Sequence, residues 1–426
     1  MRIISGEMYF YYEAAYKGLP MQIFLDEAVD EKILKKALEK TKDVHPYLAW
    51  TASEKDGDIF LEDTGDDIAL VCGEVFPILG GENLGGKLAA VVYYENCISL
   101  HFYHGLIDGV ASKRALETTL YFYYCIKDNK EYDADKVMKL KSDCFPTMFE
   151  EPFKKKISVD EELIQKVKKE KQDDPKKLFS LVGKKENCGS EDVIQTVIIP
   201  SVSLLKFSKD NKTSPSVAIA MLSCLAIMKL YPKAQDMIRV NIPISLRDAL
   251  GVSDTFKNTT ADATLYFDPL WLETDTLTQI GERLRKDLKE ILQPDRLRLM
   301  ADDAMDFLDM AANKKSFCER KAFYESITPP IADTILVSYM GKVNGGSYTE
   351  HITMAQMITI PRDGMVINVL DGGQNFAITI LKHGTDQSFA DAFLSVCHNN
   401  NMGAELKINK VYKLSDVVIK STLGLE

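Results

Sequence analysis

The sequence has no basic surplus and no long hydrophobic run. Its 52 lysines and arginines are outnumbered by 63 aspartates and glutamates, which gives a formal net charge of −11 at pH 7. This balance excludes the basic footprint of a nucleic-acid-binding protein. No apolar run reaches the roughly 18 residues that a transmembrane helix needs. The longest candidate, Ser214 to Leu230, has the length of a buried helix. The N-terminus carries Glu7 and Glu13 without a long apolar core, so we expect no signal peptide.

Cysteine and histidine are poorly placed for metal binding. None of the eight cysteines forms a CxxC pair, and only Cys397 lies beside a histidine, the adjacent His398. Structural zinc sites need closely spaced sets of such ligands. We therefore expect no metal, reduced thiols that behave as small buried hydrophobic residues, and a cytoplasmic protein.

The chain has the composition of a globular protein. Hydrophobic residues make up 46% and charged residues 27% of its 426 residues. This length predicts two domains of roughly 200 residues each. We place an N-terminal unit at residues 1–155, a charged linker at 156–190 and a C-terminal unit at 191–426. Lysine is dense from Phe153 to Asn187. This density predicts a solvated helix in the linker, with binding of an anionic ligand as the alternative.

Apolar runs alternate with amphipathic stretches, which indicates an α/β fold. A helical stripe follows the N-cap residue Asp30. Two apolar runs, Leu88–Tyr94 and Cys97–His104, are separated by two residues and predict a β-hairpin. A long helix is expected after Gly109. In the second half, a helix capped by Ser214 is apolar almost all round, so we expect it to be buried.

The segment HFYHGLIDG, His101 to Gly109, carries the sharpest signal. Alternation along the strand places His104 on the same apolar face as Phe102. His104 therefore closes that face at the end of the strand, where Gly105 breaks the pattern. Asp108 falls at the N-terminus of the following helix.

Two structural roles compete with a catalytic one for these residues. Asp108 is a good N-cap, and His104 fits a partly buried histidine. A metal pair is disfavoured, because a strand and a turn separate the two residues and no third ligand is near. As a catalyst, an imidazole with an ordinary pKa near 6.5 suits a general base that accepts a proton from a hydroxyl or amine attacking a thioester. An apolar cavity would exclude water from that reaction. Gly109 would let the chain or a ligand pass closely.

HGLIDG resembles the HxxxDG signature of the chloramphenicol acetyltransferase-like superfamily. That group includes peptide-synthetase condensation domains, plant BAHD acyltransferases and alcohol O-acetyltransferases. The context also matches, because the motif follows the second strand of a hairpin and precedes a helix. The resemblance implies an α/β sandwich of two subdomains with mixed, largely antiparallel sheets and a tunnel between them, with His104 in mid-tunnel. It also implies that a segment of the second half, Ile358 to Gly373, bridges across to the first.

The resemblance assigns roles to further residues. NIPISLRDALGVSDTFKNT resembles the family segment in which an arginine precedes an asparagine, which makes Arg247 the partner of Asp108. TILVSYMG resembles the Ser-Asn-x-Gly strand of the alcohol acetyltransferases, with tyrosine in place of the asparagine. The implied catalytic residues are His104 and Asp108, supported by Gly109 and Arg247. The implied substrate-binding residues are Asn258, Ser338, Tyr339 and Gly341, and the last three include the candidate oxyanion donors.

Departures from the family pattern narrow the expected activity. Tyr103 stands where condensation domains usually have a second histidine, and the BAHD motif DFGWG is missing. These departures favour an acyl-CoA-dependent O- or N-acyltransferase that moves an acyl group, in the first place acetyl, to a small-molecule acceptor. Coenzyme A thioester would be a co-substrate, and no permanently bound cofactor is expected. Two alternatives stay open: a free-standing condensation-type enzyme that uses an acyl carrier protein, and a non-catalytic binding protein that keeps the fold.

Overall fold

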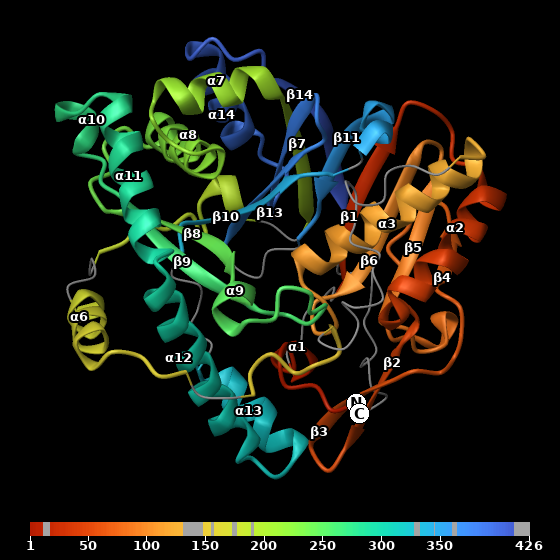
Figure 1. Cartoon of the computed structure of the whole chain (residues 1–426). Helices are drawn as coiled ribbons and strands as arrows, with labels where there is room; N and C mark the ends of the chain where they lie inside the picture. Colours follow the sequence, from red (N-terminus) through yellow and green to blue (C-terminus); the bar gives the residue numbers. More distant parts are fainter. Residues whose placement is uncertain are drawn as a thin grey trace.

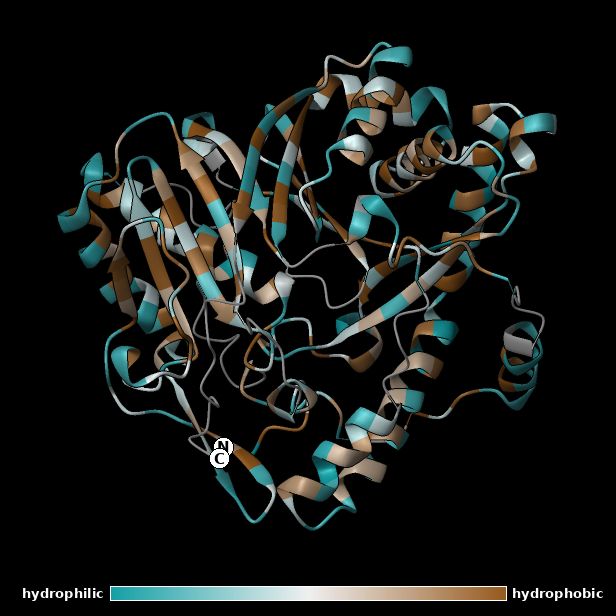
Figure 2. Ribbon diagram, turned by 180° about the vertical axis from the view of Figure 1, so that it is seen from behind, coloured by the Kyte–Doolittle hydropathy of each residue, from teal (hydrophilic) through white to brown (hydrophobic). Residues whose placement is uncertain are grey.

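The computed structural model describes residues 1–11, 18–130, 148–154, 157–172, 177–188, 191–327, 333–344, 346–359 and 364–412. Two β-sheet bodies lie side by side, each covered by helices (Figure 1). Each larger sheet mixes parallel and antiparallel pairs, and most pairs are antiparallel. The expected α/β fold of two subdomains with mixed, largely antiparallel sheets is therefore confirmed, whereas the tunnel between them stays a prediction. Figure 2 shows that the strands of both sheets are largely hydrophobic.

The first body is a five-stranded sheet with two helices, α2 and α3, packed together on it. Helix α2 (Glu31–Val44) begins at Asp30, whose side chain accepts hydrogen bonds from the backbone N–H groups of Lys32 and Ile33, as the sequence predicts. Helix α3 (Gly109–Lys127) begins at Asp108. The strand order is β11 (Ile352–Met357), β1 (Gly18–Leu25), β6 (Cys97–Tyr103), β5 (Ala89–Tyr94) and β4 (Ala69–Cys72). Shorter elements are α1 (Met8–Tyr11), η1 (Pro46–Ala49), β2 (Thr51–Lys55), β3 (Asp58–Glu62) and η2 (Glu82–Leu84).

The second body is a seven-stranded sheet against which the buried helix α8 (Pro215–Leu230) packs. Ser214 caps this helix and Pro215 occupies its first turn, as predicted. The strand order is β14 (Glu405–Tyr412), β7 (Asp192–Pro200), β13 (Asn375–His383), β12 (Met365–Asp371), β10 (Ile335–Lys342), β8 (Ile238–Ser245) and β9 (Thr260–Phe267). The other helices are α7 (Ser201–Asp210), α9 (Arg247–Leu250), α10 (Trp271–Thr274), α11 (Leu277–Ile291), α12 (Pro294–Ala312), α13 (Phe317–Ile327), α14 (Ser388–Asn399), η4 (Lys185–Asn187) and η5 (Gly346–His351).

The lysine-rich stretch forms the solvated helix α6 (Glu161–Gln172), as the sequence predicts, at the outer edge of the second body (Figure 1). Lys166 of this helix pairs with Glu290 of α11 at 3.2 Å, so part of its charge is used at the surface of the second body.

Strand β11 belongs to the second half of the chain but completes the first sheet. It pairs antiparallel with β1, with Met357 opposite Met21. The strand that crosses therefore lies directly before the segment expected to bridge, Ile358 to Gly373. The reason is that Ile352 to Met357 carries apolar residues that pack in the hydrophobic core of the first body, here called the first core. Residues 360–363 of the expected segment lie outside the described part of the chain.

A buried polar chain joins the two sheets where β11 crosses. The Thr196 hydroxyl of β7 donates to Gln356 Oε1 of β11 at 2.7 Å. The Gln356 amide in turn donates to Gln22 Oε1 of β1, also at 2.7 Å. Because all three side chains are buried, each hydrogen bond left unmade here would carry a desolvation cost. These hydrogen bonds therefore favour one relative position of the two bodies.

Apolar helices and cysteines of the described residues bear on the expectations of no membrane span and of reduced thiols. No single described helix is long and apolar enough to cross a bilayer; α7 and α8 together would suffice by length and composition, with a bend of 86° between them. The described cysteines are all free thiols, and Cys144 lies outside the described residues.

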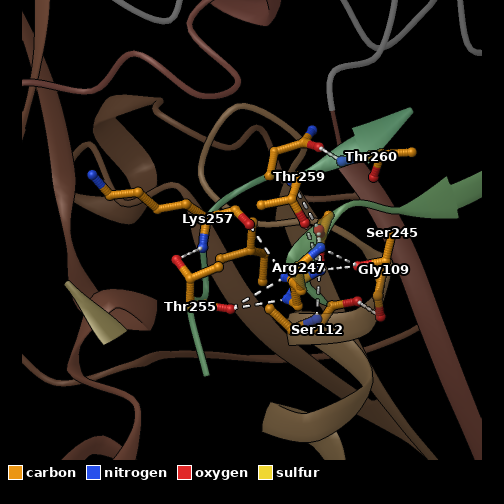
Figure 3. A network of polar contacts seen from close by, with 12 residues as sticks. Gly109, Ser112, Ser245, Arg247, Thr255, Lys257, Thr259 and Thr260 are labelled. Atoms are coloured by element: carbon orange, nitrogen blue, oxygen red, sulfur yellow. Dashed lines mark hydrogen bonds and ion pairs between the residues drawn. The ribbon is translucent and has the colours of Figure 1, made fainter. Parts of the chain in front are cut away.

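A buried ion pair connects α3 of the first body with α9 of the second. Arg247 Nη1 lies 2.7 Å from Asp108 Oδ2, and Nη2 lies 2.8 Å from Oδ1, so the pair is bidentate. The two side chains are only 4% and 1% exposed. Asp108 also accepts hydrogen bonds from the backbone N–H groups of Ala111 and Thr259. The remaining guanidinium contacts are with Ser245, Thr255, Lys257 and Thr259 (Figure 3).

Replacing Arg247 with methionine should destabilise the fold strongly, because it leaves the Asp108 carboxylate buried without its cation. We expect the free energy of unfolding to fall by about 3–5 kcal/mol. Urea denaturation measures this loss. The matched control is Arg298→Met, whose pair with Asp295 is exposed to 51% and 72% and should contribute about 1 kcal/mol or less. Equal losses in the two variants would contradict the structural role of the pair.

Candidate active site

His104 lies at the end of β6, where the chain leaves the sheet. Phe102, two residues earlier, belongs to the first core, and its ring meets the His104 ring at 6.5 Å between centroids. His101 lies on the other face of the strand, where its ring contacts Phe76 at 5.6 Å. The turn after His104 closes through hydrogen bonds from the N–H groups of Leu106 and Ile107 to the Tyr103 carbonyl. This turn leads directly into Asp108 and α3.

The hydrogen bonds of His104 favour one tautomer. Nδ1 lies 3.1 Å from the backbone carbonyl oxygen of Ile107. A carbonyl oxygen only accepts, so this contact requires a proton on Nδ1 and favours the tautomer that keeps the lone pair on Nε2; the Asn258 amide nitrogen lies farther from Nδ1, at 3.4 Å. The Asn258 amide nitrogen lies 3.2 Å from the His104 carbonyl oxygen, and the Thr260 N–H donates to Asn258 Oδ1 at 2.9 Å. These two contacts hold the Asn258 side chain beside the imidazole.

The surroundings of His104 favour its neutral form. Burial lowers the pKa of His104 below its ordinary value of 6.5, while the hydrogen bond to the Ile107 carbonyl and the charge of Asp108 act in the opposite direction. His45 and His101 differ from His104 in the causes of their pKa shifts. For His101, burial is the one cause, and it lowers the pKa to about 3. His45 also has a pKa of about 3, and its two ring nitrogens are bonded to the hydroxyls of Thr118 and Tyr47. We infer that these two histidines support the fold.

Gly109 makes room for a methionine of the second body. A Cβ atom at Gly109 would lie 2.5 Å from the terminal carbon of Met340, closer than any real contact. The close approach that the sequence predicts at Gly109 is therefore made by β10. Met340 had no sequence signal of its own, because an apolar residue in a strand is ordinary.

The structure separates the three candidates on β10. Ser338 lies on the same face as Met340, with its hydroxyl 3.8 Å from the Met340 sulfur. Tyr339 lies on the opposite face and stacks on Phe376 of the second core, with 6.4 Å between ring centroids. Gly341 has a φ of +73°, a conformation that favours glycine, and open space beside it. Of the three, Ser338 is directed towards the face that meets Gly109.

Helix α3 holds the chain that follows β10. The Lys113 ammonium donates to the Lys342 carbonyl at 2.8 Å, and Glu117 accepts a hydrogen bond from the Asn344 N–H at 2.6 Å. Lys113 and Glu117 also pair with each other at 3.0 Å. The strand end that carries Ser338 and Met340 is thereby fixed against the helix that begins at Asp108.

Tyr9 of α1 also contacts His104, with 4.4 Å between ring centroids and an interplanar angle of 40°. The sequence gives no local sign of this contact, since about 95 residues separate the two side chains.

His104 is not part of a metal-ligand cluster among the described residues. Asp26, Glu27 and His351 form a trio whose ligand atoms lie within 4.8 Å of one another. This trio lies away from His104. It is at the end of β1, whereas the start of β1, at Gly18, pairs with Tyr103 beside His104. An ammonium group, Lys127, already pairs with Glu27.

Comparison with known proteins places this geometry in a fold. No protein-family model and no curated protein sequence matches the chain. Solved structures do match. F. graminearum TRI101, complexed with coenzyme A and deoxynivalenol, superposes with a TM-score of 0.62 at 11% identity, covering 95% of this chain and 99% of that one.

Two further matches are of the same quality. TRI3 trichothecene 15-O-acetyltransferase from Fusarium sporotrichioides has a TM-score of 0.62 at 12% identity, covering 93% of this chain and 94% of its own. The first condensation domain of the CDA synthetase has a TM-score of 0.58 at 11% identity, covering 94% and 95%. The chain therefore has the two-subdomain fold of the chloramphenicol acetyltransferase-like acyltransferases and condensation domains.

Proposed function

We propose that this protein is an acyl-CoA-dependent acyltransferase in which His104 is the general base. The observation that carries the proposal is the hydrogen bond from His104 Nδ1 to the Ile107 carbonyl, because it leaves Nε2 unprotonated. The fold supports the same reaction, since solved structures with this fold include a complex with coenzyme A and a trichothecene 15-O-acetyltransferase. The acceptor would be a hydroxyl or amine of a small molecule, and the first donor to test is acetyl-CoA.

In the proposed reaction, Nε2 removes the proton of the acceptor as its oxygen or nitrogen attacks the thioester carbonyl carbon. A tetrahedral intermediate forms with a negative charge on the former carbonyl oxygen. The intermediate collapses, the carbon–sulfur bond breaks, and the coenzyme A thiolate takes the proton back from the imidazolium. The Ile107 carbonyl and the Asp108 charge both favour the transient imidazolium. Coenzyme A thioester enters as a co-substrate, and the reaction needs no permanently bound cofactor.

The other candidate residues receive supporting roles. Asp108 does not bond the imidazole in this structure; both of its oxygens bind Arg247. We assign Asp108, Arg247 and Gly109 to positioning the turn that carries His104. Asn258 is assigned to the site because it contacts His104 directly. Ser338 is the candidate donor to the tetrahedral oxyanion, because its face of β10 meets Gly109.

A carrier-protein donor is the second candidate, favoured by the likeness to a condensation domain. Donor preference separates the two. An enzyme of the first kind transfers acetyl from free acetyl-CoA. One of the second kind transfers it only from an acylated carrier protein.

Replacing His104 with glutamine should lower the rate of acyl transfer by about 10²- to 10⁴-fold, the usual contribution of a general base. The rate is measured as free thiol released from acetyl-CoA over a panel of alcohols and amines. The matched control is His351→Gln, a histidine near the far end of β1, which should keep the wild-type rate. Full activity in the His104 variant would rule out the general-base role.

The pH dependence follows from the lowered pKa of His104. The base form is the active one, and its pKa lies below 6.5. We therefore expect kcat/KM to be level from about pH 7 upwards and to fall on acidification, with its midpoint below 6.5. A profile whose acidic limb has its midpoint above pH 7 would contradict a buried neutral imidazole as the base.

A further inference from the structure

The N-terminal segment passes directly over the turn that carries His104. Gly6 has a φ of +80°, and a Cβ atom there would lie 3.0 Å from the Gly105 carbonyl oxygen and 3.3 Å from Asn258 Cβ. Three residues later, the ring of Tyr9 lies against the His104 imidazole at 4.4 Å between centroids. The segment thus contacts both His104 and its neighbour Asn258.

Buried contacts hold this segment in place at the Tyr9 carbonyl and at the two residues that follow it. Phe10 packs edge-on against Tyr103 with 4.7 Å between ring centroids, and a Cβ atom at Gly105 would meet the Phe10 ring at 2.6 Å. The Tyr103 hydroxyl donates to the Tyr9 carbonyl. The Tyr11 hydroxyl donates to the Gly57 carbonyl at 2.6 Å. The backbone is therefore fixed at the Tyr9 carbonyl and on its C-terminal side.

Glu7 anchors the start of the segment to α13. Its carboxylate is 1% exposed and accepts a hydrogen bond from the Tyr324 hydroxyl at 2.7 Å, with Arg320 at 3.4 Å. Burial raises the pKa of Glu7, and the contacts with Tyr324 and Arg320 oppose that rise. A buried carboxylate is costly unless it is paired, so the contacts with Tyr324 and Arg320 fix Glu7, and with it the start of α1, against α13.

A second ion pair ties the segment to the loop that carries Asn258. The Ser5 N–H donates to Glu151 at 2.8 Å, and Glu151 pairs with the buried Lys257. Lys257 directly precedes Asn258. The segment that carries Tyr9 and the loop that carries Asn258 therefore share one carboxylate.

Tyr9 differs from its aromatic neighbours. Phe10 and Tyr11 are 3% and 1% exposed and belong to the first core, whereas Tyr9 is half-buried. Its ring covers the imidazole. Among the described residues, the Phe102 ring, the Ile107 carbonyl, the Asn258 amide and, more remotely, the Asp108 charge also face His104.

We propose that Tyr9 is a positioning residue that covers one face of the His104 ring, keeps water from it and holds the ring plane so that Nε2 meets the acceptor. The proposal rests on the proposed function for its effect on rate. The contact itself can be tested without any substrate.

The test uses the full-length protein with ¹⁵N-labelled histidine, with the His104 signal assigned by its loss in His104→Gln. In Tyr9→Ala, water reaches the imidazole, and we expect the titration midpoint of His104 to move upwards by at least about 0.5 pH. Tyr9→Phe keeps the ring and should keep the wild-type midpoint. Met8→Ala, a neighbour on the same helix, controls for general loosening of α1 and should also leave the midpoint unchanged.

Kinetics give the second readout. We expect kcat for acyl transfer to fall about tenfold in Tyr9→Ala while KM for acetyl-CoA stays within about twofold, because the ring acts on the base and not on the donor. Tyr9→Phe should restore kcat. Thermal unfolding shows whether each variant is folded, and Tyr9→Leu, which keeps apolar volume, takes the place of an unfolded Tyr9→Ala with a smaller shift in the same direction.

The outcomes separate this proposal from the proposed function. If a folded Tyr9→Ala or Tyr9→Leu leaves the His104 midpoint at its wild-type value, the positioning role is wrong even when the wild-type enzyme transfers acetyl. If the midpoint moves but the wild-type protein transfers no acyl group, the contact is as described and the proposed function fails.

Discussion

The ion pair between Asp108 and Arg247 is the interaction on which the rest of the site depends. Asp108 caps α3 and binds a cation from the second body, so it fixes the end of the turn that begins at His104. Arg247 uses its remaining donors to order the loop from Thr255 to Thr259. Asn258 lies in that loop and contacts His104. One buried pair therefore sets helix α3, the loop and His104 relative to one another.

The same arrangement bears on the base role that we propose for His104, a histidine that lies where the two bodies meet. Burial among Phe102 and Tyr9 disfavours the charged imidazolium, whereas the Ile107 carbonyl and the Asp108 carboxylate favour it. The net effect is a pKa below the ordinary value of 6.5, and in the proposed reaction the ring would take up a proton only transiently.

Local signals in the sequence predicted the elements well. The N-caps Asp30 and Ser214 and the hairpin before His104 lie where periodicity placed them, because capping and alternation act over a few residues. A family motif was needed to connect Asp108 with Arg247, since 139 residues separate them. Helix α7 and strand β14 were not predicted, and neither was the crossing of β11 at its observed position, because these depend on how the two sheets pack.

The contacts of Met340 and Tyr9 had no sequence signal for the same reason. Each is an ordinary apolar or aromatic residue whose role comes from a partner far along the chain, Gly109 for the first and His104 for the second.

Thermal unfolding with and without acetyl-CoA tests the central claim most directly, because it needs no knowledge of the acceptor. A ligand at about 100 times its Kd adds roughly 2.7 kcal/mol to stability. A clear rise in Tm, present also in His104→Gln, is the predicted result; no rise at millimolar acetyl-CoA would contradict an acyl-CoA-dependent enzyme.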